Sequence, residues 1–298
     1  MTNNFNLESY FKDCRDMVNK ALESALPKKD AFPSKIHEAM RYSLFAGGKR
    51  IRPILCMAAS EACGGGRREA IPVACALEMI HTFSLVHDDL PAMDDDSLRR
   101  GVPTNHTVFG EDVAILAGDG LAIQAFVVLG KLVDTQRNFK KVLEIIHDIA
   151  LATGSVGMIG GQILDMQAEG KKITLDELKK LHELKTGRLI AASVSSGAKL
   201  VSDSMGQIAA LEHYGELIGL AFQIADDILD IEGGAELGKD IGSDVANGKS
   251  TYPALMGLEE ARKMAFTLRD EAIGTLREFG PEADALRAIA DYIVNRKS

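Results

Sequence analysis

Two short acidic stretches lie far apart in this chain, and each directly follows a long apolar segment with helical spacing. The first is Asp88-Asp89-Leu-Pro-Ala-Met-Asp94, and the second is Asp226-Asp227-Ile-Leu-Asp230. Carboxylates crowded beside apolar surface repel one another and lose hydration, so something cationic has to compensate them. Hard divalent ions are suited to this, and Mg²⁺ is usually held by one or two carboxylates together with substrate phosphates. We therefore expect a fold in which the two stretches face each other across a cavity and hold one polyphosphate.

Helical periodicity recurs along the whole chain, and no convincing run of alternating strand residues interrupts it. The apolar residues are mostly Ala, Leu, Ile and Met, which favour helices. No low-complexity linker divides the chain, and no solenoid-type repeat is present. The sequence predicts one all-α domain over residues 1–298, with Thr174 and Glu177 forming a capping box. Helices are expected at 7–26, 34–46, 51–63, 69–89, 111–133, 138–154, 174–184, 186–200, 205–231, 253–279 and 281–296.

The bulk composition limits the classes of function. A net charge of -9 argues against general nucleic-acid binding, so an anionic ligand needs metals or local clusters of Arg and Lys. The four cysteines lack CxxC spacing and suit a reducing, cytoplasmic setting. The first twenty residues contain Glu8, Asp13 and Asp16 and no long apolar run, which speaks against a targeting peptide. No stretch approaches 18 uninterrupted apolar residues, so no membrane span is expected.

The second acidic stretch fits a helix. Asp226 and Asp230 share one face, and Gln223 lies close to that face one turn earlier. The opposite side is apolar and should be buried; it carries Leu220, Ile224, Ile228 and Ile231. A helix-cap cluster or a solvated acidic face is the alternative interpretation of this motif alone.

The first stretch is less regular, because Asp88 and Asp94 are six residues apart and fall on different faces of an ideal helix. Pro91 disfavours a straight helix, so a kink or loop is needed to bring Asp94 back towards Asp88. His81 lies on the face of Asp88 two turns earlier, either as a substrate ligand or as a structural hydrogen-bonding group. Arg99 and Arg100 follow the acids; they suit phosphate oxygens, or they form ion pairs with the acids.

A third cluster reads Gly47-Gly48-Lys49-Arg50-Ile51-Arg52-Pro53. Three cations at a glycine-rich helix junction make an anion site, although a basic helix cap is the alternative. It lacks the spacing of a Walker A loop. Weaker signals come from Lys185-Thr186-Gly187-Arg188, Lys239 and Lys249. Together the clusters predict a helical cavity with two metal-dependent walls and one metal-free basic pocket, suited to two phosphorylated substrates.

These motifs resemble those of the trans-isoprenyl diphosphate synthases, including bacterial farnesyl and plant and cyanobacterial geranylgeranyl diphosphate synthases. The resemblance covers nearly the whole chain, with several independent motifs in the same order. The matching segments are Ile36 to Cys56, Met79 to His106, Gly160-Gly161-Gln162, His182 to Gly187, Phe222 to Asp230 and Gly248 to Leu258.

The resemblance implies an isoprenoid-synthase-type helical bundle around a central cavity, and usually a homodimer. It assigns the metal ligands, which would hold three Mg²⁺, to Asp88, Asp89, Asp94, Asp226, Asp227 and Asp230. It matches the surroundings of the allylic diphosphate to Arg99, Lys185, Thr186, Gln223, Lys239 and Lys249. It matches the isopentenyl diphosphate pocket to Lys49, Arg52, His81 and Arg100. Catalytic roles are expected for Asp88, Asp89, Asp94, Arg99, Lys185, Asp226 and Lys239.

The implied reaction is ionisation of the allylic diphosphate, attack by the isopentenyl double bond, and loss of a proton. In similar enzymes, an aromatic residue at the position of Phe83, followed here by Ser84, and a two-residue insertion in the first motif close the pocket at fifteen carbons. Farnesyl diphosphate is therefore the predicted main product, with geranylgeranyl diphosphate as the alternative.

Three other classes fit less well. A terpene cyclase would not need the basic pocket of Lys49 and Arg52 or a second motif of the form DDxxD. A non-catalytic partner subunit commonly loses one aspartate motif, whereas both are intact here. A structural helical protein has no reason to place so many carboxylates beside apolar segments.

Overall fold

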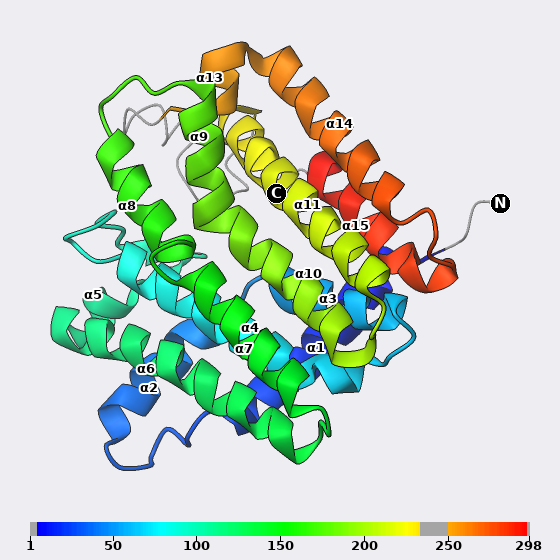
Figure 1. The fold of residues 1–298 in the computed structure, drawn as a ribbon. Coiled ribbons are helices and arrows are strands. Elements are labelled where there is room, and N and C mark those ends of the chain that lie inside the picture. The colour runs from blue at the N-terminus through cyan, green and yellow to red at the C-terminus, as the bar shows by residue number, and fades with distance from the viewer. Residues whose placement is uncertain (1–4, 233–249, 297–298) are drawn as a thin grey trace.

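The computed structural model describes residues 5–232 and 250–296, and this part of the chain is almost entirely helical (Figure 1). The prediction of an all-α fold is thereby confirmed. Within the described residues the β-structure is one antiparallel pair of two-residue strands, β1 (Leu98–Arg99) and β2 (Val102–Pro103). This small hairpin follows the first acidic stretch and orients the two arginines of that region.

Most helix boundaries lie within a few residues of the predicted ones. The long helices are α1 (Leu7–Ala25), α2 (Ser34–Leu44), α3 (Ile51–Ala62), α4 (Arg67–Asp88), α6 (Glu111–Gly130), α7 (Phe139–Thr153), α8 (Met158–Ala168), α10 (Arg188–Val201), α11 (Met205–Glu232), α14 (Leu258–Thr275) and α15 (Asp284–Asn295). Shorter elements are α5 (Asn105–Phe109), η1 (Lys131–Asp134), α9 (Leu175–His182), η2 (Glu183–Gly187), α13 (Tyr252–Met256) and η4 (Pro281–Ala283).

Three elements differ from the sequence prediction. Helix α8 was not predicted, because Gly160 and Gly161 lower the helix propensity of a segment that tertiary packing makes helical. The short helix α5 was missed as well. The helix expected over 253–279 is two helices, α13 and α14, because Gly257 adopts φ +87 between them. The predicted capping box is confirmed, since the Glu177 carboxylate accepts the Thr174 amide N–H at 2.7 Å.

Helix α4 occupies the interior of the bundle and packs against α3 and α6. Helix α10 bridges α3 and α11, while α14 covers another side of α11 (Figure 1). Two very close approaches bring the site elements together. A Cβ on Gly161 would lie 2.2 Å from the backbone nitrogen of Lys185, and a Cβ on Gly219 would lie 2.8 Å from the Cα of Gly187. Only glycine therefore lets α8 and α11 pack this tightly against the turn of residues 183–187.

Three helical stretches are long and apolar enough to cross a membrane by length and composition: Arg67–Asp88, Glu111–Asp134 and Phe139–Ala168. The prediction that no segment spans a membrane rested on the absence of an uninterrupted apolar run. The criterion for these three stretches is the mean hydropathy of an 18-residue window, which allows up to two charged residues. In the first stretch, 67% of the most apolar window is buried inside the protein. A core helix of this kind is apolar because it packs on all sides against other helices.

A buried ion pair joins the basic segment to the middle of α4. The guanidinium of Arg50 donates to the Glu78 carboxylate at 2.7 Å, and both side chains are 2% exposed. Arg50 also donates to the carbonyl of Leu44 at 2.7 Å. Its backbone has φ 56, a left-handed conformation that is rare for a residue with a side chain. The pair therefore fixes the turn that leads into α3 and presents Lys49 and Arg52.

Replacing Glu78 with Leu leaves the Arg50 charge buried without its partner, which typically costs about 3–5 kcal/mol. We expect a loss of that size in the free energy of unfolding, measured by denaturant titration. The double variant Arg50→Met/Glu78→Leu removes both charges and should recover most of it. Asp16→Asn, which breaks the exposed Lys12–Asp16 pair, is the matched control and should change little. A Glu78→Leu protein as stable as the parent would contradict the assigned role.

Candidate active site

The first acidic wall is the C-terminal end of α4 and the turn that follows it. The helix ends at Asp88, and the chain then folds back so that the amide N–H of Asp94 donates to the carbonyl of Asp88 at 2.8 Å. Asp95 completes the turn with φ 52. The loop expected from Pro91 is therefore present, and it brings Asp94 to the same cavity as Asp88.

Asp89 faces a different direction from its neighbour. Its buried carboxylate accepts from Nε of Arg99 at 2.8 Å, and the same guanidinium donates to Asp96 at 2.9 Å. The alternative in which the acids bind the arginines as ion pairs thus holds for Arg99. Arg99 still lines the acidic cavity. Asp89 lines a smaller neighbouring pocket with Arg99 and Arg100, so its predicted metal role stays a prediction.

The second acidic wall is the end of α11, where the three aspartates differ in exposure. Asp227 is buried and accepts the amide N–H of Tyr252 at 2.9 Å. The side chain of Asp226 is 47% exposed and forms an ion pair with Arg296 at 2.5 Å. Asp230 is partly buried on the same helix. The predicted apolar side holds for Ile224 and Ile228 but is wrong for Ile231, which is 42% exposed because α11 extends beyond the core there.

The third element is the π-helical turn η2, where one extra residue is inserted between α9 and α10. It aims Lys185 into the cavity, where its ammonium pairs with the carboxylate of Asp165 on α8. Thr186 is buried beside it. Gln223 on α11 lines the same space, so all three predicted groups meet there.

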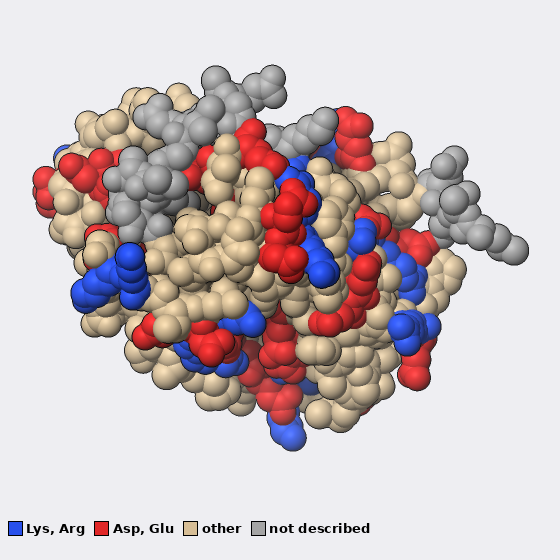
Figure 2. Space-filling model, turned by 90° about the horizontal axis from the view of Figure 1, so that it is seen from above, with Lys and Arg blue, Asp and Glu red and all other residues tan. Residues whose placement is uncertain are grey.

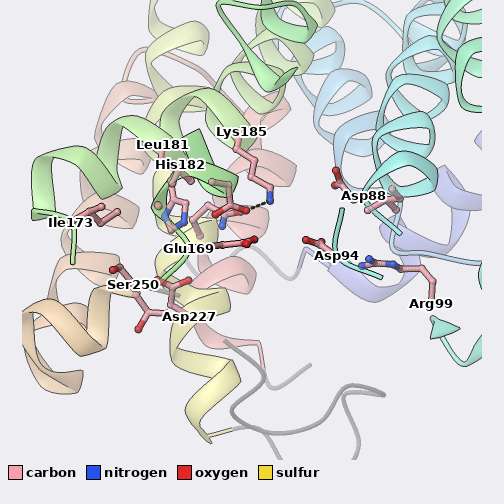
Figure 3. A pocket seen from close by; sticks show the side chains of 15 residues that line it. Asp88, Asp94, Arg99, Glu169, Ile173, Leu181, His182, Lys185, Asp227 and Ser250 are labelled. Atoms are coloured by element: carbon pink, nitrogen blue, oxygen red, sulfur yellow. Dashed lines mark hydrogen bonds and ion pairs between the residues drawn. The ribbon is translucent and has the colours of Figure 1, made fainter. Parts of the chain in front are cut away.

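Two connected cavities bring these elements together. A polar cavity of about 250 Å³ is lined by Asp88, Asp94, Arg99 and Lys185 together with Asp227. Figure 3 shows Asp88 and Asp94 on one side of it and Lys185 and Asp227 on the other. A second cavity of about 520 Å³ is lined by both Asp88 and Asp226 and continues between apolar side chains. The two cavities share Leu85, Asp88, Lys185 and Gln223. The two acidic stretches therefore face one space, as expected.

The apolar part of the larger cavity is lined by residues of α4 and α8. These are Phe83, Ser84, His87, Met158, Ile159, Ile163 and Met166. Phe83, predicted to limit chain length, is 8% exposed and lies in this wall with Ser84. An acidic end and an apolar end in one cavity suit a ligand with a charged head and a hydrocarbon tail.

The basic pocket lies beside the polar end. Arg52 and His81 both line the larger cavity, and Nε of Arg52 is buried without a partner. Burial lowers the Arg52 pKa to about 10. Burial also lowers the His81 pKa well below its usual value, and the positive Arg52 lowers it further, so His81 is neutral at pH 7. A buried donor beside neighbouring cations is the local chemistry that a diphosphate would satisfy.

The two other cations predicted for this pocket, Lys49 and Arg100, are not among the residues that line the larger cavity, and Arg100 lines the smaller pocket beside Asp89. The Lys49 pKa is lowered, first by burial and then by Arg296, which places these two positive charges near each other. Arg100 donates to the carbonyl of Gly47, and its guanidinium lies against Gly48 so closely that a Cβ there would be 2.5 Å from Nη1. Gly48, with φ +125, is therefore required for this contact.

The donor set fits Mg²⁺. The Asp88 pKa is raised to about 6, first by burial and to a smaller extent by the nearby Asp94 and Asp89, while Lys185 and Arg99 act in the opposite direction. Such carboxylates gain from a hard cation. Among the described residues, no three His, Cys, Asp or Glu side chains converge into a complete metal site. Mg²⁺ is commonly held by one or two carboxylates together with substrate phosphates.

Sequence reasoning missed three charged residues at the site, and one of them, Glu169, lines the polar cavity. Asp165 pairs with Lys185, and Arg296 stacks on Phe222 with its guanidinium carbon 3.8 Å from the ring centroid while pairing with Asp226. Only the tertiary fold brings these residues to the cavity. Lys239 and Lys249 lie outside the described residues.

Seen from above, the described part of the surface carries acidic and basic side chains side by side (Figure 2).

The chain is similar to known proteins over its whole length. A family model for polyprenyl synthetase matches residues 33–291. A geranylgeranyl diphosphate synthase from Cyanophora paradoxa is 47% identical over 99% of this chain and 98% of that protein. A farnesyl diphosphate synthase from Bacillus subtilis is 43% identical over 99% of both. The structure of an FPP/GFPP synthase from Zymomonas mobilis matches with a TM-score of 0.87 and 38% identity, covering 97% of this chain and 99% of that chain.

The similarity covers the full length of the chain, and the chain has a cavity with two acidic walls. Together these two findings define the protein as a trans-prenyltransferase. The chain belongs to the polyprenyl synthetase family. The family resemblance inferred from the sequence is therefore confirmed.

The raised pKa of Asp88 predicts how metal affinity depends on pH. Metal binding requires the carboxylate, which becomes protonated as the pH falls through about 6. We expect the affinity for Mn²⁺ with inorganic diphosphate to fall about tenfold for each pH unit below that point. The metal-free protein should behave oppositely and gain stability as the pH falls, because its folded state binds this proton more tightly than the unfolded state.

Calorimetric titration with Mn²⁺ between about pH 5 and pH 8 measures this dependence. Asp88→Asn is the control variant and should bind weakly with a flatter pH profile. A parent protein whose affinity is the same at both ends of that range would contradict the expectation.

Proposed function

We propose that this protein is a Mg²⁺-dependent farnesyl diphosphate synthase, which joins isopentenyl diphosphate head-to-tail to dimethylallyl and geranyl diphosphates. The observation that carries the proposal is one cavity that is lined by the acidic residues Asp88 and Asp226 and also by apolar side chains that include Phe83. The head group of the allylic substrate would lie between the acidic walls, and its hydrocarbon tail would extend towards Phe83. The names of relatives support both this product and the twenty-carbon one.

The acidic walls would promote ionisation of the allylic substrate, in which the diphosphate leaves. The six aspartates of the two stretches would hold Mg²⁺, with three ions in each site. Bound Mg²⁺ supplies Lewis-acid stabilisation of the negative charge that develops on the leaving diphosphate. Arg99 and Lys185 add fixed positive charge at the same place, oriented by Asp89 and Asp165 respectively. In this proposal Lys239 and Lys249 also contact this substrate.

The remaining residues control the reacting carbon chain. Thr186 and Gln223 present oxygen dipoles beside the position where the allylic cation forms. The apolar walls from α4 and α8 exclude the water that would otherwise capture it. Lys49, Arg52, His81 and Arg100 would hold the isopentenyl diphosphate so that its double bond attacks the cation. The released diphosphate would take the proton that is lost.

A geranylgeranyl diphosphate synthase is the second candidate, and its distinguishing feature is a deeper apolar cavity. Phe83 argues for the shorter product, because its ring occupies the wall in which a smaller residue would leave room. A terpene cyclase is disfavoured by the basic pocket around Arg52. A non-catalytic subunit is disfavoured by two intact acidic stretches.

We also propose that the protein is a homodimer. Exposed apolar side chains gather on α6, on α7 and in the turn that joins α7 to α8, including Ile123 (65% exposed), Leu143 (66%) and Val156 (62%). These helices lie next to one another in the bundle (Figure 1). An apolar face of this kind is typical of a surface that a second subunit covers. Light scattering on the purified protein measures the mass directly, and a mass of one chain would contradict the proposal.

Incubation with labelled isopentenyl diphosphate and each allylic starter tests the reaction itself. We expect prenyl diphosphates of fifteen carbons as the main product, no product in EDTA, and full recovery on adding Mg²⁺. Asp226→Ala removes one wall and should lower kcat/KM by at least about a hundredfold, since charge stabilisation of a leaving group contributes several kcal/mol. A parent protein that retains activity in EDTA would refute the metal-dependent scheme.

Replacing Phe83 with Ala tests the chain-length assignment. The change opens the closed end of the cavity, so we expect twenty-carbon and longer products in place of the fifteen-carbon one. Chromatography of the dephosphorylated products measures the distribution. Phe32→Ala removes an aromatic ring that is 97% exposed and should leave the distribution unchanged. Identical products from Phe83→Ala and the parent would show that the cavity ends elsewhere.

A further inference from the structure

His87 contacts Phe83 in the wall of the larger cavity. The two residues are one turn apart on α4 and therefore lie on the same face of the helix. Their rings meet edge to face, with centroids 5.4 Å apart and an interplanar angle of 87°. Both side chains line the larger cavity. Movement of the Phe83 ring towards His87 is therefore limited by the position of the imidazole.

The imidazole is itself held in place by α6. Nε2 of His87 lies 3.0 Å from the carbonyl oxygen of Ile115, and because a carbonyl only accepts, the ring donates through that nitrogen. The carboxylate of Asp119 lies 3.9 Å from the same nitrogen. This hydrogen bond fixes the orientation of the ring between α4 and α6.

Gly118, on the same helix as Ile115, makes room for the ring. A Cβ at this position would lie 2.2 Å from Nε2 and 2.4 Å from Cδ2 of His87. Real Cβ atoms do not approach so closely, so any larger residue at 118 displaces the imidazole. Since the backbone of α6 lies behind the ring, the available direction of displacement is towards Phe83 and the cavity.

Gly118, His87 and Phe83 thus form a contiguous stack that runs from the backbone of α6 to the closed end of the cavity. We propose that His87, seated on Gly118, is a positioning residue that sets product length by fixing the depth at which Phe83 closes the chain pocket. This inference rests on the proposed prenyl-transfer function. It assigns a specificity role to a residue pair outside the metal and diphosphate sites.

A different role for His87 is a simple tie between α4 and α6 through its hydrogen bond. The two roles predict different behaviour. A tie would affect stability and overall rate without altering the ratio of products. A positioning role alters that ratio, and it depends on the bulk of the ring more than on its hydrogen bond.

The test uses four variants of the full-length protein and compares the ratio of twenty-carbon to fifteen-carbon products. His87→Ala removes the support, so we expect this ratio to rise at least tenfold although Phe83 is intact. His87→Phe keeps a ring of similar size and should retain the parent ratio. Gly118→Ala pushes the imidazole into the cavity and should shift products towards ten carbons. Gly130→Ala, on the same helix with open space around its Cβ, is the control and should change nothing.

Thermal unfolding of each variant shows whether it folds, and Gly118→Ala tests the inference even if His87→Ala does not fold. Unchanged product ratios in folded His87→Ala or Gly118→Ala would overturn it. Equal shifts in His87→Ala and His87→Phe would also overturn it, because the bulk of the ring would then have no part in the effect. A parent protein that forms no prenyl diphosphate would instead contradict the proposed function on which the inference rests.

Discussion

The structure depends on the cost of placing carboxylates beside apolar surface. Asp88 lies where an acidic cavity joins an apolar one, and burial together with neighbouring aspartates raises its pKa to about 6. Within the described residues, this charge is opposed by Lys185 and Arg99. Those two cations are themselves engaged by Asp165 and Asp89. Positive and negative side chains in the site therefore partly neutralise each other, so that a divalent cation and an anionic substrate can bind together without leaving a large net charge.

Glycine determines how closely the walls of this site approach. Gly161 and Gly219 let α8 and α11 pack directly against the turn that carries Lys185, and Gly48 lets Arg100 lie on the basic loop. A methyl group at any of these positions would meet atoms at less than 3 Å. Close packing at these glycines thus helps to position the charged side chains, and Arg100 is held in addition by its hydrogen bond to the carbonyl of Gly47. The buried pair of Arg50 and Glu78 performs the corresponding task for the start of α3.

Much of this could be predicted from the sequence, because helical periodicity, acidic spacing and Gly or Pro breaks are local signals. The fold class, most helix ranges and the return of Asp94 to Asp88 followed from such signals. Helix α8 was missed because its glycines act against local propensity and its packing partners are distant in sequence. Arg296 and Asp165 were missed for a similar reason, since only tertiary contacts bring them to Asp226 and Lys185. The exposure of Ile231 reflects where the core ends, which periodicity does not report.

Helix α4 carries both Asp88 at its end and Phe83 five residues earlier. At a rise of 1.5 Å per residue, these two positions are separated by about 7.5 Å along one rigid rod. In the proposed reaction, the residue that anchors the head group and the residue that limits the tail would therefore lie on one helix at a fixed separation. Exchanging side chains along α4 would then change the length of the hydrocarbon product, while the charged residues at the C-terminal end of the helix stay the same.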